Sequence, residues 1–112
     1  MTYLLTSPQR KASGGTLYFE FQKGPFKGTF WKDDSLYLHA DTFDRLDFSP
    51  LFSAALPDFH YYGDTRVSPH QYELLNASAL ERGGETALLF AELHTWVTEC
   101  FQKDPCFTIL GI

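Results

Sequence analysis

The chain has 112 residues, a formal net charge of −5 and an aromatic content of 17%. This length fits one domain, 1–112, and the apolar content suffices for a core without a metal, a cofactor or a disulfide framework. No run approaches the roughly 20 apolar residues of a membrane helix, and residues 1–8 lack a basic segment before an apolar run. Two cysteines without a signal segment favour reduced thiols, so we expect a cytoplasmic protein without membrane contact.

The first part of the chain is predicted to form strands joined by turns. Residues 7–15 collect turn formers and charged residues, which favours a loop. Apolar and polar residues then alternate over three segments, 16–22, 26–32 and 35–40. Because the turns between them are short, the sequence predicts a three-stranded antiparallel meander.

The predicted strands have one apolar and one aromatic-polar face. The alternation places on the apolar face Leu17, Phe19, Phe21, Phe26, Phe30, Leu36 and Leu38. It places on the other face Tyr18, Trp31, Tyr37 and His39. One side of an antiparallel sheet can face water, and exposed Tyr, Trp and His have the composition of an interface core. The alternative is that helices cover this face.

After residue 40 the pattern becomes mainly helical. Residues 41–48 are predicted to form a helical turn or a loop, and Ser49-Pro50 begins a short helix that Pro57 ends. Residues 59–62 read as a fourth strand. Ser68 and Gln71 form a capping box for a second helix, which ends at Gly83-Gly84.

The clearest helix is predicted over 85–102. Its apolar stripe comprises Leu89, Leu93, Trp96, Val97 and Cys100, flanked by Phe90 and Phe101. Residues 106–112 are mostly apolar, which is typical of a final strand buried between neighbours. The predicted fold is therefore α+β, with an antiparallel sheet of about four to five strands (the N-terminal meander plus the C-terminal strand) and two to three helices packed on one face.

The sequence contains no motif for catalysis, a metal or a cofactor. The four histidines lack the spacing that places two on one helix face for a metal, and His70 with Glu73 cannot fill a zinc shell. Cys100 lies on the apolar stripe and Cys106 begins a strand, so both are expected to be structural. We therefore expect a protein that is not an enzyme.

Charge is distributed unevenly along the chain. Residues 1–32 carry five basic residues against Glu20 alone, whereas residues 33–112 have a net charge of −9. Seven Asp residues lie within 33–64, with only Arg45 to oppose them. An acidic surface disfavours nucleic acid and speeds association with a basic protein. The residues predicted to bind a partner are Asp33, Asp34, Asp41, Asp44, Asp58, Tyr61, Tyr62 and Asp64, with Trp31 and Tyr37 as anchors.

Three stretches carry a resemblance to a class of bacterial proteins: residues 59–65, the helix end at Trp96-Val97, and residues 107–112. The chain resembles the immunity proteins of contact-dependent growth inhibition and polymorphic toxin systems. The resemblance implies a cytoplasmic monomer that neutralises a cognate toxin, often a basic nuclease, by stoichiometric binding. Two alternatives stay open. One is a small enzyme or ligand-binding protein with a cleft of His60, His70 and Glu73, and the other is a homodimeric adaptor paired through the aromatic strand face.

Overall fold

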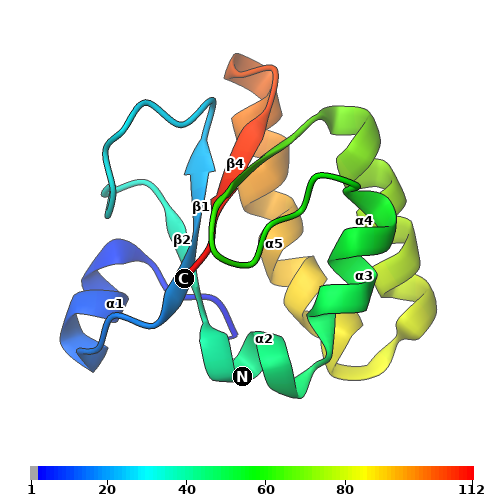
Figure 1. Ribbon diagram of the computed structural model, residues 1–112, viewed down its shortest axis with the longest axis horizontal. Coiled ribbons are helices and arrows are strands. Elements are labelled where there is room, and N and C mark those ends of the chain that lie inside the picture. Colours follow the sequence, from blue (N-terminus) through cyan, green and yellow to red (C-terminus); the bar gives the residue numbers. More distant parts are fainter. Residues whose placement is uncertain (1–2) are drawn as a thin grey trace.

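One four-stranded antiparallel sheet organises the computed structural model, which describes residues 3–112 (Figure 1). Within these residues the strands are β1 (Tyr18–Lys23), β2 (Leu36–His39), β3 (Asp64–Val67) and β4 (Phe107–Leu110). The helices are α1 (Ser7–Ser13), α2 (Ala40–Arg45), α3 (Phe48–Ala55), α4 (Pro69–Arg82) and α5 (Gly84–Lys103). The predicted α+β class and antiparallel sheet are confirmed. None of the helices in the described part has the length and apolar character that a bilayer-spanning segment needs.

The strand order is β2-β1-β4-β3, so β4 lies between two neighbours as its apolar sequence predicts. All four of its residues are buried. The register pairs Phe21 of β1 with Leu36 on one side and Ile109 on the other. Directly paired residues share a face of the sheet, so these three side chains point to the same side.

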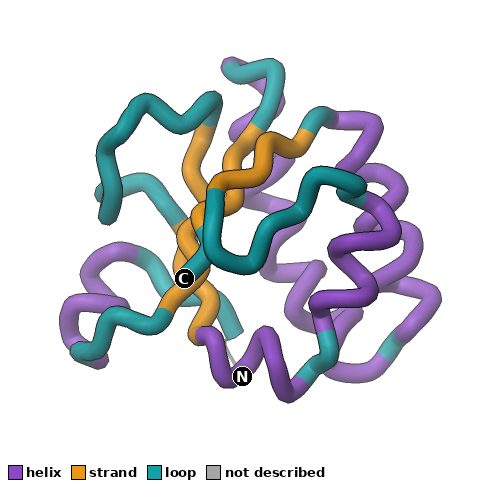
Figure 2. Tube along the Cα trace, viewed as in Figure 1, coloured by secondary structure: helices purple, strands orange, loops and turns teal. Residues whose placement is uncertain are grey.

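Helices α3, α4 and α5 lie on that side of the sheet. Helix α1 lies on the opposite side, beside β2 (Figures 1 and 2). The core between sheet and helices is rich in aromatic rings. Phe43 lies at its centre, with its ring centroid 4.2 Å from that of Phe19 and 5.2 Å from that of Phe52. Aromatic pairs at such spacings add to the stabilisation that apolar burial supplies.

The helices α4 and α5 form as the sequence predicts. Ser68 Oγ accepts from the Gln71 amide, and the Gln71 side chain accepts from the Ser68 amide. Gly83, with a φ of +70°, lets the chain leave α4 and enter α5 directly. Every residue of the predicted α5 stripe, from Leu89 to Cys100, is buried in the core.

Two predictions for local structure are wrong. Residues 7–13 form helix α1 instead of a loop, because Thr6 and Gln9 make a capping box and Pro8 fits the first turn. Residues 59–62 form a turn instead of a strand. There the Tyr62 amide donates to His60 Nδ1, 3.1 Å away, and the strand β3 begins two residues later.

The predicted meander is also wrong, because its middle segment is a loop. Residues 24–35, here called the β1–β2 loop, fold back over the sheet instead of pairing with it (Figure 2). Gly28 and Trp31 have φ values of +88° and +59°, in the left-handed region. Positive φ at both positions breaks the extended backbone on which an alternating pattern depends.

Candidate functional site

The face of the sheet opposite the helices is polar and covered. Its strand residues include Glu20, which pairs with Tyr37 on one side and Leu110 on the other. The β1–β2 loop and α1 lie over this face. The prediction that it is open to a partner is therefore wrong: Tyr37 is fully buried, and Tyr18 is 5% exposed. Tyr37 is not available as an anchor.

The Glu20 carboxylate holds the β1–β2 loop in place. Oε1 accepts from the Trp31 amide, and Oε2 accepts from the Lys32 amide, both at 2.9 Å. Oε2 also accepts from Ser35 Oγ at 2.7 Å and from Gln22 Nε2 at 2.9 Å. A buried carboxylate needs several donors to offset its lost hydration, and the loop supplies three of these four.

Trp31 combines an unusual backbone with a partly exposed ring. A φ of +59° is rare for a bulky residue and costs roughly 1–3 kcal/mol, which the bond to Glu20 helps to offset. The ring stacks on Tyr37 with centroids 5.8 Å apart, and the Arg10 guanidinium lies 4.3 Å from the Trp31 ring centre. Trp31 remains 39% exposed, so this predicted anchor is both fixed and accessible.

Beside Trp31 the surface has an apolar depression, here called the aromatic hollow. It has a volume of about 280 Å³ and is lined by Phe26, Phe30, Tyr62, Gly63, Asp64, Leu110, Gly111 and Ile112. A second depression of about 190 Å³ shares Phe30 and Leu110 with it and extends to Trp31. Phe30 is 57% exposed and Tyr62 is 72% exposed, so two large rings meet water here. Among the described residues that line the hollow, Asp64 alone has an acidic or basic side chain.

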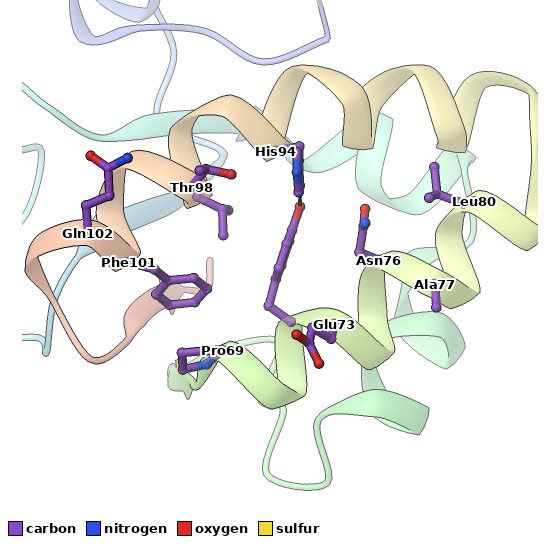
Figure 3. Close-up of a pocket in the computed structure, with 11 residues that line it drawn as sticks. Pro69, Glu73, Asn76, Ala77, Leu80, His94, Thr98, Phe101 and Gln102 are labelled. Atoms are coloured by element: carbon purple, nitrogen blue, oxygen red, sulfur yellow. Dashed lines mark hydrogen bonds between the residues drawn. The ribbon is translucent and has the colours of Figure 1, made fainter.

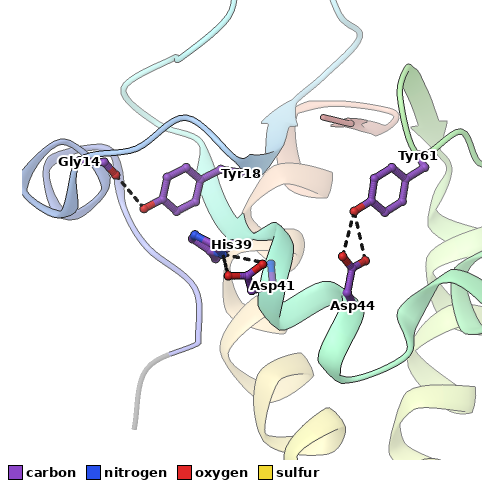
Figure 4. A network of polar contacts seen from close by, with 6 residues as sticks. All are labelled: Gly14, Tyr18, His39, Asp41, Asp44 and Tyr61. Atoms are coloured by element: carbon purple, nitrogen blue, oxygen red, sulfur yellow. Dashed lines mark hydrogen bonds and ion pairs between the residues drawn. The ribbon is translucent and has the colours of Figure 1, made fainter.

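Three aspartates, Asp41, Asp44 and Asp64, are here called the acidic cluster. Asp64 lines the hollow itself, and a pair of tyrosines connects the hollow to Asp44. The Tyr61 ring lies 4.8 Å from the Tyr62 ring, and the Tyr61 hydroxyl donates to both carboxylate oxygens of Asp44, at 3.1 and 3.2 Å (Figure 4). Burial raises the pKa of Tyr61, and the hydrogen bond to Asp44 raises it further. Asp41 lies one turn earlier on α2, where its amide donates to His39 Nδ1 at 3.0 Å. Asp41, Asp44 and Asp64 are all exposed.

The remaining predicted residues, Asp33, Asp34 and Asp58, line neither of these two depressions. Asp33 is 4.0 Å from Lys11 Nζ. Asp34 lines a separate depression of about 320 Å³ together with Lys23, Lys27, Lys32 and Lys103. Four lysines make that depression unsuited to a basic partner. Asp58 is exposed in the segment between α3 and β3.

Sequence reasoning missed Phe26 and Phe30 as surface residues. The alternating pattern assigned both to the apolar face of a strand, and the β1–β2 loop instead presents them beside each other, with ring centroids 5.1 Å apart. Leu17, also assigned to the apolar face, is 54% exposed. Two local signals oppose an extended conformation for residues 26–32: the Lys23-Gly24-Pro25 turn just before the segment and Gly28 within it.

A groove between α4 and α5, of about 500 Å³, is larger than the depressions described above (Figure 3). Its α4 side includes Glu73, Asn76 and Leu80, and its α5 side includes His94 and Phe101. It includes Glu73 from the predicted cleft, but neither His60 nor His70 lines it. The three side chains of that cleft are therefore not gathered in this groove.

Both cysteines are free thiols and buried, in agreement with their predicted structural role. Burial raises the pKa of each thiol, which favours the unreactive protonated form. Among residues 3–112 no three His, Cys, Asp or Glu side chains are placed to hold a metal ion. Comparison with family models, curated proteins and solved structures found no match to this chain.

Proposed function

We propose that this protein binds a basic protein through the aromatic hollow and the acidic cluster beside it. In this proposal it is a cytoplasmic immunity protein that neutralises a toxin domain by stoichiometric binding. The observation that carries the binding proposal is the pair of exposed rings, Phe30 and Tyr62, bordering a depression in which Asp64 is the only acidic or basic side chain among the described lining residues. The toxin class follows from the sequence resemblance.

The composition of the region supports a protein partner. Interfaces place aromatic residues in a desolvated centre with a polar rim, and Trp and Tyr are frequent hot spots. Here Trp31, Phe30 and Tyr62 supply the centre, and Asp41, Asp44 and Asp64 supply the rim. An interface of about 800 Å² per partner would cover the hollow and the cluster together.

Charge supports a basic partner. Asp41 and Asp44 are exposed on the same helix, and Asp64 borders the hollow itself. Exposed carboxylates near an interface mainly raise the rate of association with a positively charged surface, and salt screens that effect. Many nucleases are basic because they bind phosphate, so a nuclease toxin fits this surface.

The first experiment is growth rescue and calorimetry with a candidate toxin domain encoded beside this protein's gene. Tyr62→Ala and Trp31→Ala are expected to weaken binding at least 30-fold, about 2 kcal/mol each, and to abolish rescue. Leu74→Ala and Leu88→Ala are the matched controls, because these leucines are also exposed but lie on α4 and α5. Equal losses in both sets would contradict the assignment of the surface.

Trp31 permits a further control. Trp31→Gly removes the ring and also relieves the left-handed strain, whereas Trp31→Ala removes the ring and keeps the strain. If the ring binds the partner, both variants lose affinity equally although Trp31→Gly is the more stable of the two. If loop strain alone matters, their affinities differ.

The acidic part of the proposal is tested by stopped-flow association at increasing salt. Asp41→Asn with Asp44→Asn should slow association several-fold at low salt and leave dissociation nearly unchanged. Asp33→Asn, which lies outside the cluster, should have little effect. An association rate that salt does not change would exclude charge steering. Light scattering of the free protein distinguishes a monomeric inhibitor from self-association through the hollow.

A further inference from the structure

We propose that the groove between α4 and α5 binds a small amphiphilic amine, a molecule with an apolar body and one cationic amino group. The site lies on α4 and α5, away from the aromatic hollow, and does not depend on the proposed protein partner. Its shape, its walls and the sign of its charge carry the inference.

The dimensions suit a small molecule. A volume of about 500 Å³ lies within the roughly 300–1,000 Å³ of ligand pockets, and the space between helices is a common place for them. The walls are largely apolar, with Pro69 and Leu80 on the α4 side and Val97 and Phe101 on the α5 side. Leu80 is 54% exposed, so an apolar ligand body would cover surface that now meets water.

An aromatic pair, Tyr72 of α4 and His94 of α5, belongs to the lining of the groove. The Tyr72 hydroxyl and His94 Nδ1 lie 2.9 Å apart, and the two rings stack at an interplanar angle of 21° (Figure 3). Burial raises the pKa of Tyr72 to about 12, so its hydroxyl stays protonated at neutral pH. Because this hydroxyl is occupied by His94 and Tyr72 is 4% exposed, Tyr72 serves the groove as a rigid part of its wall.

Charge decides which headgroup fits. Glu73 lines the groove, and no Lys or Arg is among the described residues that line it. Within residues 3–112 the Glu73 carboxylate has no basic partner within 4.0 Å. The face of an aromatic ring attracts a cation, and Phe101 lines the same groove as Glu73, so an ammonium group would find both an aromatic ring and an opposite charge there. An anionic headgroup would meet Glu73 with no Lys or Arg among the described lining residues to compensate the repulsion.

The test uses three probes that share one body and differ in headgroup: 4-phenylbutylamine, 4-phenylbutan-1-ol and 4-phenylbutyrate. Amide chemical shifts of the ¹⁵N-labelled protein give both the affinity and the location. The amine is expected to bind about two- to fivefold more tightly than the alcohol, as for an exposed ion pair, and the acid most weakly. Shifts should centre on Tyr72, Thr98 and Phe101.

Two variants separate the headgroup from the body. Glu73→Gln should abolish the preference for the amine over the alcohol while the alcohol still binds. Glu81→Gln, the same change on the same helix outside the groove, should leave the preference intact. Ala77→Trp, at an exposed lining position, should fill the groove and weaken all three probes.

Three results would overturn the proposal. These are equal affinities of the wild-type protein for the three probes, shifts that centre on the aromatic hollow, and no saturable shift up to roughly 10 mM amine, which is beyond the range of weak small ligands.

Discussion

The two faces of the sheet are covered by different means. Helices α3, α4 and α5 cover one face, and beneath them the strand residues Phe19, Phe21 and Phe107 are almost fully buried. The β1–β2 loop covers the other face and is held there by hydrogen bonds to Glu20. The first cover is non-directional and shared by many residues, whereas the second relies on directional hydrogen bonds. Several of these converge on Glu20, and others join the loop carbonyls of Thr29, Lys32 and Asp34 to side chains outside the loop.

This difference separates stability from surface function. Apolar burial on the helical side supplies most of the folding free energy, because it scales with the area removed from water. The loop side buries fewer large side chains, among them Tyr18, Tyr37 and Leu110, and leaves Phe30 and Trp31 partly exposed. Substitutions in the loop can therefore change a binding surface while the fold is kept, which substitutions in the core cannot do.

The largest effect is expected from the helical side. Phe52→Ala removes a ring that is 1% exposed and packs against Phe43, Phe48 and Phe90. The free energy of unfolding should fall by about 3–5 kcal/mol through lost burial and a cavity. Urea unfolding followed by circular dichroism measures it. A loss below about 1 kcal/mol would show that the core can close around the missing ring.

A smaller loss, about 2–3 kcal/mol, is expected for Glu20→Ala, which leaves the donors of the β1–β2 loop without their acceptor. The distinctive readout is local: the amides of Trp31 and Lys32 should exchange hydrogen much faster, while those of α5 keep their relative protection. Glu99→Ala, on an exposed α5 position, is the control. Unchanged exchange at Trp31 would mean that other contacts hold the loop.

Alkaline pH tests a polar contact on the helical side. The folded pKa of Tyr72, about 12, lies above the ordinary value of 10.0, because burial penalises the phenolate. The stability from this shift is fully present below pH 10 and is lost as pH rises from 10 through 12, by about 3 kcal/mol in all. Comparing wild type with Tyr72→Phe isolates it from the other tyrosines. Equal pH dependence of the two proteins would refute the assignment.

The smallest effect is expected at Phe30. The Phe30 ring lies on the loop and is 57% exposed, so Phe30→Ala should lower the free energy of unfolding by about 0.5 kcal/mol or less. The same urea experiment as for Phe52→Ala measures it, so the two phenylalanines compare the two faces directly. A loss near that of Phe52→Ala would show that the loop is part of the cooperative core.

The elements that could be predicted from sequence are those with local signals. The capping box of Ser68 and Gln71 and the turn at Gly83-Gly84 fix α4, and the continuous apolar run fixes β4 as a central strand. The β1–β2 loop could not be predicted, because its conformation depends on Glu20, whose polar position in the alternation resembles any solvent-facing residue. A hydrogen bond to a buried acceptor elsewhere in the chain does not alter the pattern of apolar and polar residues from which strands are predicted.

The sequence predicted the kinds of residue at the candidate site, aromatic and acidic, but only some of their positions. Trp31, Tyr62 and Asp64 lie at or beside the hollow, and Tyr61 connects it to Asp44. Tyr37 is buried instead, because its strand face is covered by the loop that was expected to be a strand. That a partner uses the others stays a prediction.

Gly111 offers a way to disturb the hollow without removing any ring. Its amide donates to the Gly63 carbonyl, and a Cβ at this position would overlap the Tyr61 carbonyl oxygen. Any side chain there must wedge the turn of residues 61–63 away from β4. In a saturation-mutagenesis screen that scores folding and binding separately, position 111 should therefore reject every residue except glycine, although it has no side chain to lose.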